Sequence, residues 1–260
     1  MADDMDTASP PPLARRALAE FLGTGLLVTI VVGSGIAART LSPGDTGLQL
    51  LQNSLATALG LAVLILALGP VSGVHLNPLV SAVDALLGRR DRAGLSPREL
   101  AVFVGAQLLG GLSGAVLANA MFEIPTSIAT TERVTAGTLL GEVVATAGLI
   151  LVILSLARTG RGPLAAAAVG AYIGAASWFT SSTSFANPAV TLGRVLSDTF
   201  AGIAPASVLP FVAAQIVGAA IGVGLAVLLF PGAARAAGRL VTPATSTSSH
   251  VRTVDPEGLL

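Results

Sequence analysis

The sequence contains no cysteine and no lysine, and few of its residues are charged or aromatic. Without cysteine the chain forms no disulfide and offers no thiolate nucleophile or thiolate metal ligand, and the redox state of its compartment is left open. Charged residues make up 11% of the 260 residues and hydrophobic residues 53%. So few charges do not cover the surface of a water-soluble globule of this length, which favours a lipid bilayer as the solvent.

The charges that are present balance, and so they point to no polyanionic partner. Fourteen basic residues, all of them arginine, match fourteen acidic residues at a formal net charge of zero. A nucleic-acid partner is not predicted, because such proteins carry a basic excess. Two histidines without cysteine give little basis for a metal site, and none is expected.

Six segments approach the length of a membrane-spanning helix, which needs about 17 to 25 mostly apolar residues. These segments are residues 17–38, 53–71, 101–121, 137–157, 163–180 and 209–230. Small residues are frequent in all six, and they allow the close helix approach that holds bundles together in lipid. The sequence therefore predicts an all-α membrane protein with six transmembrane helices.

Arginine is distributed unequally between the two sides of this predicted bundle. If the spans alternate in direction, eleven arginines fall on the side of the chain ends, and only Arg39, Arg133 and Arg194 fall on the other. The positive-inside rule then places both termini in the cytoplasm and supports an even number of spans. We therefore expect a multi-pass protein of the cell (inner) membrane, with a lipid bilayer as its surroundings.

The composition of the two chain ends differs from that of the middle. Residues 1–12 contain three Asp and a Pro triplet, the reverse of a basic and then apolar signal peptide, and the last twenty residues are rich in Ser and Thr. We predict disordered cytoplasmic tails at residues 1–14 and 233–260 around a membrane domain at residues 15–232.

The two halves of this domain share short motifs, which indicates an internal duplication. Residues 103–107 (FVGAQ) recur as residues 211–215 (FVAAQ), and residues 18–20 (LAE) recur as residues 140–142 (LGE). The repeats would cover residues 15–121 and 137–232, each with three crossings. Because three is odd, the second repeat must be inverted relative to the first, about an axis in the membrane plane where a shared site is expected.

Each half also contains an Asn-Pro pair followed by an apolar stretch that is too short to span the bilayer. The two motifs are Asn77-Pro78-Leu79 and Asn187-Pro188-Ala189, and their apolar stretches run to residues 87 and 196. Asn is a strong N-cap and Pro is favoured at the first helical position, so each pair predicts the start of a half-helix. If both re-enter the bilayer, their N-termini meet near its centre, where partial positive charge repels cations and the Asn amides can donate to a passing solute.

These motifs resemble those of the major intrinsic protein family, the aquaporins and aquaglyceroporins, over residues 15–232. The match rests on residues 72–78 (SGVHLNP), 187–189 (NPA), 19–21 (AEF) and 141–142 (GE). The resemblance implies six transmembrane helices plus two re-entrant half-helices, with a pore for small neutral solutes in every subunit of a homotetramer. Leu79 departs from the usual Asn-Pro-Ala, and we expect it to lie under the Asn layer and adjust the packing there.

The resemblance also implies a second constriction, on the outer side, that usually contains an Arg directly after the second Asn-Pro-Ala. Val190 takes that place here, so the fixed positive charge is missing from it. The other filter positions fall on Thr57, Ala175 and Ser184, with Ser177 and Thr183 as alternatives to the last two. Four small side chains predict a wide, uncharged filter with hydroxyl groups from Thr57 and Ser184.

Such a filter resembles that of bacterial aquaglyceroporins associated with arsenic-resistance genes, whose implied cargo is neutral metalloid hydroxides and methylated arsenicals. The alternative is an ordinary water or glycerol pore whose filter is tuned by neighbouring residues. Arg194, one helical turn beyond Val190, is expected to point to the outer end of its half-helix and to pair with Asp198.

Two acidic residues, Glu20 and Glu142, occupy matching places near the starts of the first and fourth spans. Ionisable residues inside a span are functional candidates, and proton coupling is one interpretation. The repeat and the resemblance favour another, in which each carboxylate accepts hydrogen bonds from the backbone of a re-entrant loop. His75 is expected to line the cytoplasmic vestibule or to anchor its loop, with pH sensing as the alternative.

A proton-coupled secondary transporter is the main rival function, because inverted repeats and broken helices occur there too. An intramembrane enzyme is disfavoured, because no nucleophile, base and orienting group stand at a recognisable spacing. A passive channel for neutral solutes needs no energy source, so no cofactor is expected.

Overall fold

The computed structural model describes residues 11–89 and 94–231. Within them the long helices are α1 (Leu13–Leu41), α2 (Thr46–Ser72), α4 (Pro97–Met121), α5 (Ala136–Arg158), α6 (Ala165–Phe179, preceded by the 3₁₀ turn η1 at Gly162–Leu164) and α8 (Pro205–Leu229). These six, with η1 counted into α6, are the helices of the described residues that are long and apolar enough to cross a membrane. The predicted tails, apart from residues 11–14, lie outside the described residues; Leu13 already belongs to α1.

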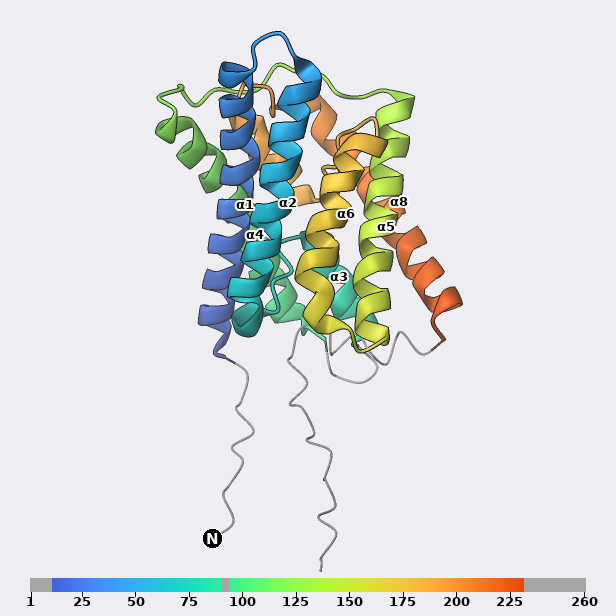
Figure 1. The fold of residues 1–260 in the computed structure, drawn as a ribbon. Helices are drawn as coiled ribbons and strands as arrows, with labels where there is room; N and C mark the ends of the chain where they lie inside the picture. The colour runs from blue at the N-terminus through green and yellow to red at the C-terminus, as the bar shows by residue number, and fades with distance from the viewer. Residues whose placement is uncertain (1–10, 90–93, 232–260) are drawn as a thin grey trace, which may run out of the picture.

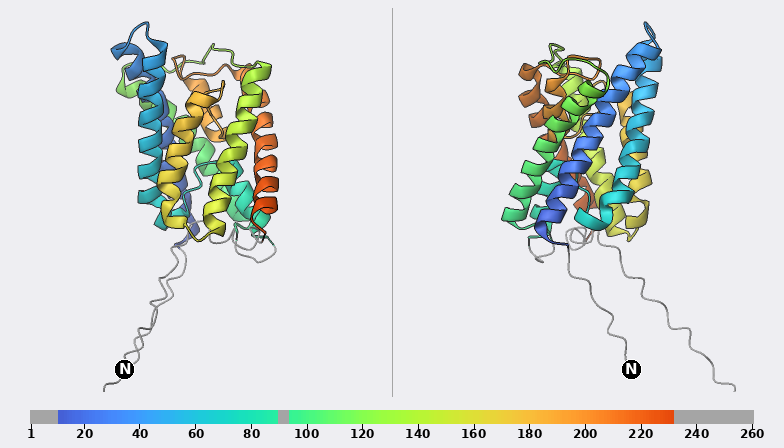
Figure 2. Two further views of the ribbon diagram at one scale, coloured as in Figure 1. Left: turned by 45° about the vertical axis from the view of Figure 1, so that its right-hand side comes forward. Right: turned by 90° about the vertical axis from the view of Figure 1, so that its left-hand side faces the viewer.

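The long helices pack side by side in one bundle (Figures 1 and 2). The start of α1 and the end of α8 lie at the same end of it, as an even number of crossings requires (Figure 1). The main helix pairs are α1 with α4 and α5 with α8, which occupy equivalent places in the two halves. The all-α prediction with six spans is therefore confirmed.

Glycine permits the close crossing in each of these helix pairs. A Cβ on Gly114 of α4 would collide with the carbonyl of Gly25 in α1, and a Cβ on Gly222 of α8 would collide with the carbonyl of Ala147 in α5. Gly114 and Gly222 are separated by 108 residues, the same spacing as between residues 103–107 and 211–215. At these crossings the helices meet through backbone-to-backbone contact and not through large apolar side chains. In lipid the hydrophobic effect does not drive helix association, so close van der Waals packing of this kind stabilises the pairs.

Two short α-helices complete the part of the chain that the structure describes, and both begin at an Asn-Pro pair. Helix α3 (Pro78–Leu87) is capped by Asn77, whose Oδ1 accepts from the backbone N–H of Leu79 at 2.9 Å. Helix α7 (Pro188–Gly193) is capped by Asn187 in the same manner and continues as the 3₁₀ turn η2 (Arg194–Leu196). Both half-helices therefore span the predicted residues, and α3 contacts α7 inside the bundle.

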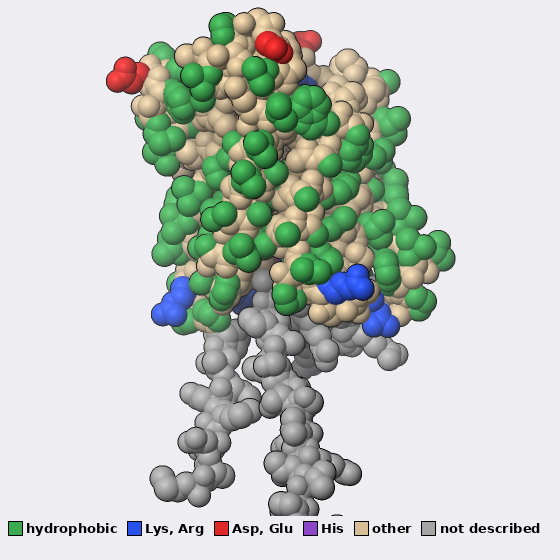
Figure 3. Space-filling view, viewed as in Figure 1, with side chains coloured by type: hydrophobic (Ala, Val, Ile, Leu, Met, Phe, Trp, Pro, Cys, Tyr) green, Lys and Arg blue, Asp and Glu red, His purple; other side chains and the backbone are tan. Residues whose placement is uncertain are grey.

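The outer surface of the bundle is apolar around its middle. Large hydrophobic side chains such as Leu59, Leu66, Leu109 and Leu140 are exposed on it. On the face drawn in Figure 3, hydrophobic side chains cover the middle, Arg side chains lie near the end where α1 begins and α8 ends, and acidic side chains lie at the opposite end. This distribution is that of a lipid-facing belt between two polar ends.

Candidate functional site

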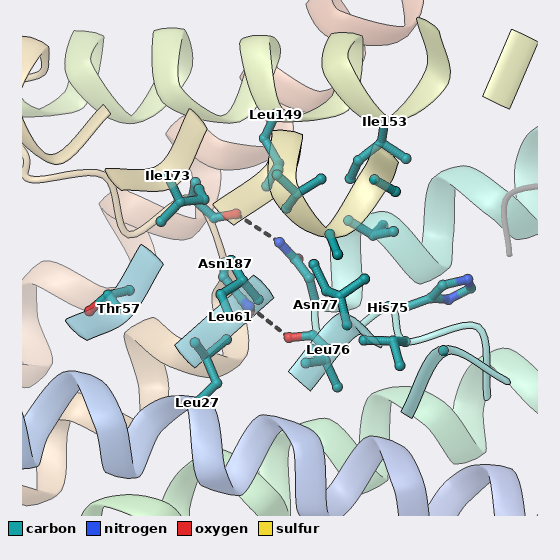
Figure 4. A pocket seen from close by; sticks show the side chains of 18 of the residues that line it. Leu27, Thr57, Leu61, His75, Leu76, Asn77, Leu149, Ile153, Ile173 and Asn187 are labelled. Atoms are coloured by element: carbon teal, nitrogen blue, oxygen red, sulfur yellow. Dashed lines mark hydrogen bonds between the residues drawn. The ribbon is translucent and has the colours of Figure 1, made fainter. Parts of the chain in front are cut away.

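The side chains of Asn77 and Asn187 lie in the middle of the bundle and bond reciprocally to the two re-entrant loops. Asn77 donates from Nδ2 to the carbonyl of Ala186 at 2.8 Å, and Asn187 donates from Nδ2 to the carbonyl of Leu76 at 2.7 Å (Figure 4). Each Oδ1 is occupied by helix capping. Because an amide nitrogen carries two hydrogens, one N–H of each Asn is left for a solute.

Both Asn side chains line a cavity of about 1380 Å³. Its other lining residues come from both ends of the bundle. Arg158 and Pro163 line it near the end where α1 begins and α8 ends, and Asn53 and Arg194 line it towards the other end. Thr57 and His75 lie on opposite sides of the Asn pair (Figure 4). The arrangement is that of a passage through the bundle with the two Asn at its centre.

The wall of the cavity is apolar on the helices and polar on the loops. Helices α1, α2, α5 and α6 contribute aliphatic side chains, of which Leu27, Leu61, Leu149 and Ile173 are drawn in Figure 4. The re-entrant loops contribute backbone; the carbonyls of Val74 and Ser184 accept no hydrogen bond in the described part of the chain. A solute in the cavity can therefore replace the hydrogen bonds that it loses to water only along the two loops.

The two re-entrant loops share an unusual backbone conformation. Val74 and Leu76 have φ values of 45° and 47°, and Ser184 and Ala186, 110 residues later, have φ values of 55° and 47°. Residues other than glycine rarely adopt this left-handed backbone conformation, and each one destabilises the folded state by about 1–3 kcal/mol. The strain persists because surrounding groups hold the loops in place.

Glu20 is the group that holds the first loop. Its carboxylate accepts from the backbone N–H of His75 at 3.0 Å and of Leu76 at 2.8 Å, and also from Ser72 Oγ and Gln107 Nε2, each at 2.7 Å. The side chain is fully buried. An ionised carboxylate has about four acceptor sites, so these donors fill them.

Glu142 occupies the equivalent position beneath the second loop. It accepts from the backbone N–H groups of Phe185 and Ala186, each at 2.9 Å, and from Gln215 Nε2 at 2.6 Å. Both glutamates thus accept hydrogen bonds from the backbone of a re-entrant loop, as expected.

Comparison with known proteins agrees with this geometry. The family model described as major intrinsic protein matches residues 7–186, more than half of the chain. The chain belongs to the major intrinsic protein family. The resemblance drawn from the motifs is thereby confirmed, and its inverted-repeat architecture accounts for the paired loops of this family member.

Two curated relatives of this major intrinsic protein cover most of its length. The aquaglyceroporin AqpS of Rhizobium meliloti is 47% identical, over 80% of this chain and 86% of the relative. The glycerol uptake facilitator protein of Pseudomonas aeruginosa is 31% identical, over 85% of this chain and 90% of the relative. Among solved structures, the aquaglyceroporin from Plasmodium falciparum superposes with a TM-score of 0.63 at 21% identity, over 85% of this chain and 99% of that one, and shows the shared fold.

Of the four expected filter residues of this family member, the structure brings three to the cavity. Thr57, Ser184 and Val190 line it, whereas Ala175 does not and is exposed on the outside of α6. The expectation for Ala175 is wrong on this geometry, because the helix turns that position outward. The alternatives Ser177 and Thr183 do line the cavity, as does Ile173.

The hydroxyl groups near this filter are not equivalent. The Oγ of Ser184 is sealed from the cavity and has no hydrogen-bond partner among the described residues. The Oγ of Ser177 donates to the carbonyl of Ile173 at 2.9 Å. Thr57 forms no such bond within the described chain, so among these three its hydroxyl is the free donor, contrary to the expectation that Ser184 would share this role.

The third residues of the two Asn-Pro motifs pack away from the passage. Leu79 is absent from the cavity lining and packs against a cluster that contains Val83 and Ile150. Ala189 is fully buried, with its carbonyl directly against Gly111 of α4. Leu79 therefore contributes to packing beneath the Asn layer, where it was expected.

His75 both lines the cavity and is tied to its loop. Its Nδ1 lies 3.0 Å from Ser81 Oγ, and its ring meets the Phe103 ring edge-on at a centroid distance of 5.7 Å. His75 thus lines the cavity, as expected, and is held there by contacts with α3 and α4; pH sensing by His75 stays a prediction.

Sequence reasoning missed the hydroxyl groups that orient the two buried glutamines. Gln107 Nε2 also donates to Ser81 Oγ, and Gln215 Nε2 also donates to Thr191 Oγ1, each at 2.9 Å. The signal was available, because Ser81 and Thr191 each stand four residues after the Asn of their motif.

The expected pairing of Arg194 with Asp198 is wrong. Asp198 accepts instead from the backbone N–H of Thr130 at 2.9 Å and from its hydroxyl. Arg194 is buried, donates from Nε to the carbonyl of Ala201, and places its guanidinium over the ring of Phe185. Arg194 lines the cavity, and the carbonyl of Ala201 and the ring of Phe185 give its guanidinium a more sheltered site than the surface carboxylate of Asp198 offers.

Proposed function

We propose that this protein is a passive channel for small uncharged solutes, including polyols such as glycerol and neutral metalloid hydroxides such as arsenite, and that it excludes protons and other cations. The observation that carries the proposal is the pair of half-helix N-termini whose Asn77 and Asn187 amides each keep one N–H at the cavity. Two opposed helix N-termini favour dipolar solutes and disfavour cations.

The filter residues support a cargo larger than water. Val190 replaces the large cationic side chain usual at that place, and Thr57, Ser177 and Thr183 are small polar residues. The names of two relatives, an aquaglyceroporin and a glycerol uptake facilitator, agree with a polyol-sized cargo. Methylated arsenicals belong to the same proposal, because their added methyl groups suit the small side chain of Val190.

Stopped-flow measurements on proteoliposomes test this function. We expect swelling in gradients of glycerol and arsenite as well as water, with rates linear in solute concentration and independent of a proton gradient. Water flux alone would favour the alternative of a water-selective aquaporin. Saturable uptake that requires an imposed proton gradient would favour a secondary transporter, in which Glu20 and Glu142 would carry protons.

We further propose a homotetramer in the cytoplasmic membrane, with both chain termini inside the cell. The arginine-rich end of the bundle supports this orientation (Figure 3). Protease protection of either terminus in inside-out vesicles would contradict the orientation. Light scattering of the detergent-corrected particle tests the number of subunits.

A further inference from the structure

Arg194 is a buried cation that forms no ion pair with an acidic side chain within the described chain. It begins η2, one turn beyond Val190, and only 6% of its surface is exposed. Its guanidinium carbon lies 3.5 Å from the centroid of the Phe185 ring. The described residues contain an ion pair between Arg16 and Glu99, but none that involves Arg194.

The terminal nitrogens of Arg194 are not committed to the protein within the described residues. The residue lines the cavity, and its Nε is the nitrogen that is committed to the protein, through the carbonyl of Ala201. Neither Nη atom has a hydrogen-bond partner among the described residues, and neither is sealed from solvent. Because a guanidinium carries five N–H donors, four remain for whatever occupies the cavity.

Arg133 shows what a purely structural arginine looks like in the same place. Its guanidinium carbon lies 5.4 Å from the same Phe185 ring, but it is absent from the cavity lining. It donates from Nε to the carbonyl of Gly202 at 2.6 Å and from Nη2 to the carbonyl of Phe200 at 2.9 Å. Arg133 therefore ties loops together, whereas Arg194 keeps its donors free.

The inverted repeat makes the cavity electrically asymmetric at this level. The residue equivalent to Arg194, 110 positions earlier, is Asp84. Its Oδ2 accepts from the backbone N–H of Leu95 at 2.9 Å, and the side chain does not line the cavity. At this position of the repeat, therefore, a charged side chain lines the cavity in the outer half only, and that charge is positive; Arg158, outside the repeated motif, lines the cavity near its other end.

We propose that Arg194 is a specificity-determining residue of the outer pore, which supplies from one turn farther out the fixed positive charge that Val190 lacks. Its charge opposes the entry of cations from the outer side, and its Nη groups donate to the oxygen atoms of neutral solutes that carry several hydroxyl groups. Stacking on Phe185 holds the planar group against the wall, which leaves the filter beside Val190 open to wide solutes. This proposal rests on the proposed channel function.

The absence of native cysteine permits a direct test by charge replacement. Arg194→Cys is reconstituted into proteoliposomes and treated with a trimethylammonium or a sulfonate methanethiosulfonate reagent. We expect the untreated variant to leak Na⁺ about tenfold faster than the wild type, and to pass glycerol less well relative to water. The cationic reagent should restore cation exclusion, and the anionic reagent should increase the leak further. Equal effects of the two reagents, or no leak in the untreated variant, would overturn the proposal.

Arg133→Cys is the matched control, because it removes a guanidinium beside the same ring but outside the cavity. Its Na⁺ leak should stay at the wild-type level with either reagent. If the Na⁺ leak instead follows the charge of the label at position 133, any charge near Phe185 controls cation exclusion. That result would contradict the assignment of cation exclusion to Arg194.

Two further variants keep the test decisive if Arg194→Cys does not fold. Arg194→Lys retains the charge but loses the planar donors, so it should exclude Na⁺ while the ratio of glycerol to water flux falls. Arg194→Met should lose both properties. Identical behaviour of the two variants would reject the proposal. A wild-type protein that passes neither water nor glycerol defeats the channel function itself, whereas one that passes glycerol with Arg194 variants unaltered defeats only this inference.

Discussion

Gln107 donates a 2.7 Å hydrogen bond from Nε2 to the carboxylate of Glu20, and this bond joins α4 to α1 beneath the first re-entrant loop. Gln215 and Glu142 repeat the arrangement between α8 and α5 at 2.6 Å. Each carboxylate is buried and surrounded by donors. The glutamates therefore act as fixed acceptors for irregular backbone that lipid cannot satisfy, which is the role that the channel function requires of them.

Replacement of Glu142 by Gln should destabilise the fold. The new amide brings N–H groups to backbone donors that need an acceptor, and an unsatisfied buried group of this kind costs about 2 kcal/mol or more. The midpoint of thermal unfolding in detergent, followed by the fluorescence of the single tryptophan, Trp178, measures the loss. Glu132→Gln, in an exposed loop, is the control and should leave the midpoint unchanged. A stable Glu142→Gln protein that loses only gradient-driven uptake would support the transporter alternative.

Val190→Arg should narrow the filter and add a second positive charge near Arg194. Glycerol and arsenite flux should fall roughly tenfold while water flux is reduced less, because the added side chain excludes wide solutes first. Stopped-flow swelling in matched gradients measures both. Val190→Leu adds bulk without charge and separates the two causes. Unchanged glycerol and arsenite uptake in the Arg variant would show that Val190 does not form the constriction.

Asn187→Asp should weaken cation exclusion at the centre of the cavity. A carboxylate there offsets the positive helix N-termini, and we expect the Na⁺ and proton leak of proteoliposomes to rise about tenfold. Asn119→Asp is a matched control, since Asn119 is fully buried and donates to the carbonyl of Leu196 but does not line the cavity. An Asn187→Asp protein that stays tight to both ions would count against the role assigned to Asn187.

Gly114→Ala should destabilise the crossing of α1 and α4. The new methyl group would collide with the carbonyl of Gly25, and such overpacking costs about 1–3 kcal/mol. Gly105→Ala on the same helix meets no atom within 4 Å, and should be neutral or gain up to about 1 kcal/mol from helix propensity. Thermal unfolding of the two variants side by side tests the difference; equal midpoints would mean that the helices can shift without loss.

Most of the fold could be read from local signals in the sequence. The six apolar segments, the two Asn-Pro pairs and the repeated motifs each depend on residues close together in the chain, and each has one physical interpretation in lipid. Helix ends were less predictable. Helix α2 begins at Thr46, well before the predicted residue 53, because Gln49 and Asn53 find acceptors on α1 and the loop after it, and so can remain helical at the outer end of the bundle.

The sequence by itself determined that the chain spans a membrane, that its halves are inverted copies, and which residues cap the half-helices. Those properties follow from composition, periodicity and short motifs. Only the tertiary structure decided which side chains face the passage. It turned Ala175 outward, sealed the hydroxyl of Ser184, and drew Arg194 away from Asp198 towards Phe185 and the cavity. The reason is physical: the direction of a side chain in a re-entrant loop or a 3₁₀ turn is set by acceptors and rings that come from distant parts of the chain, and no local pattern records them.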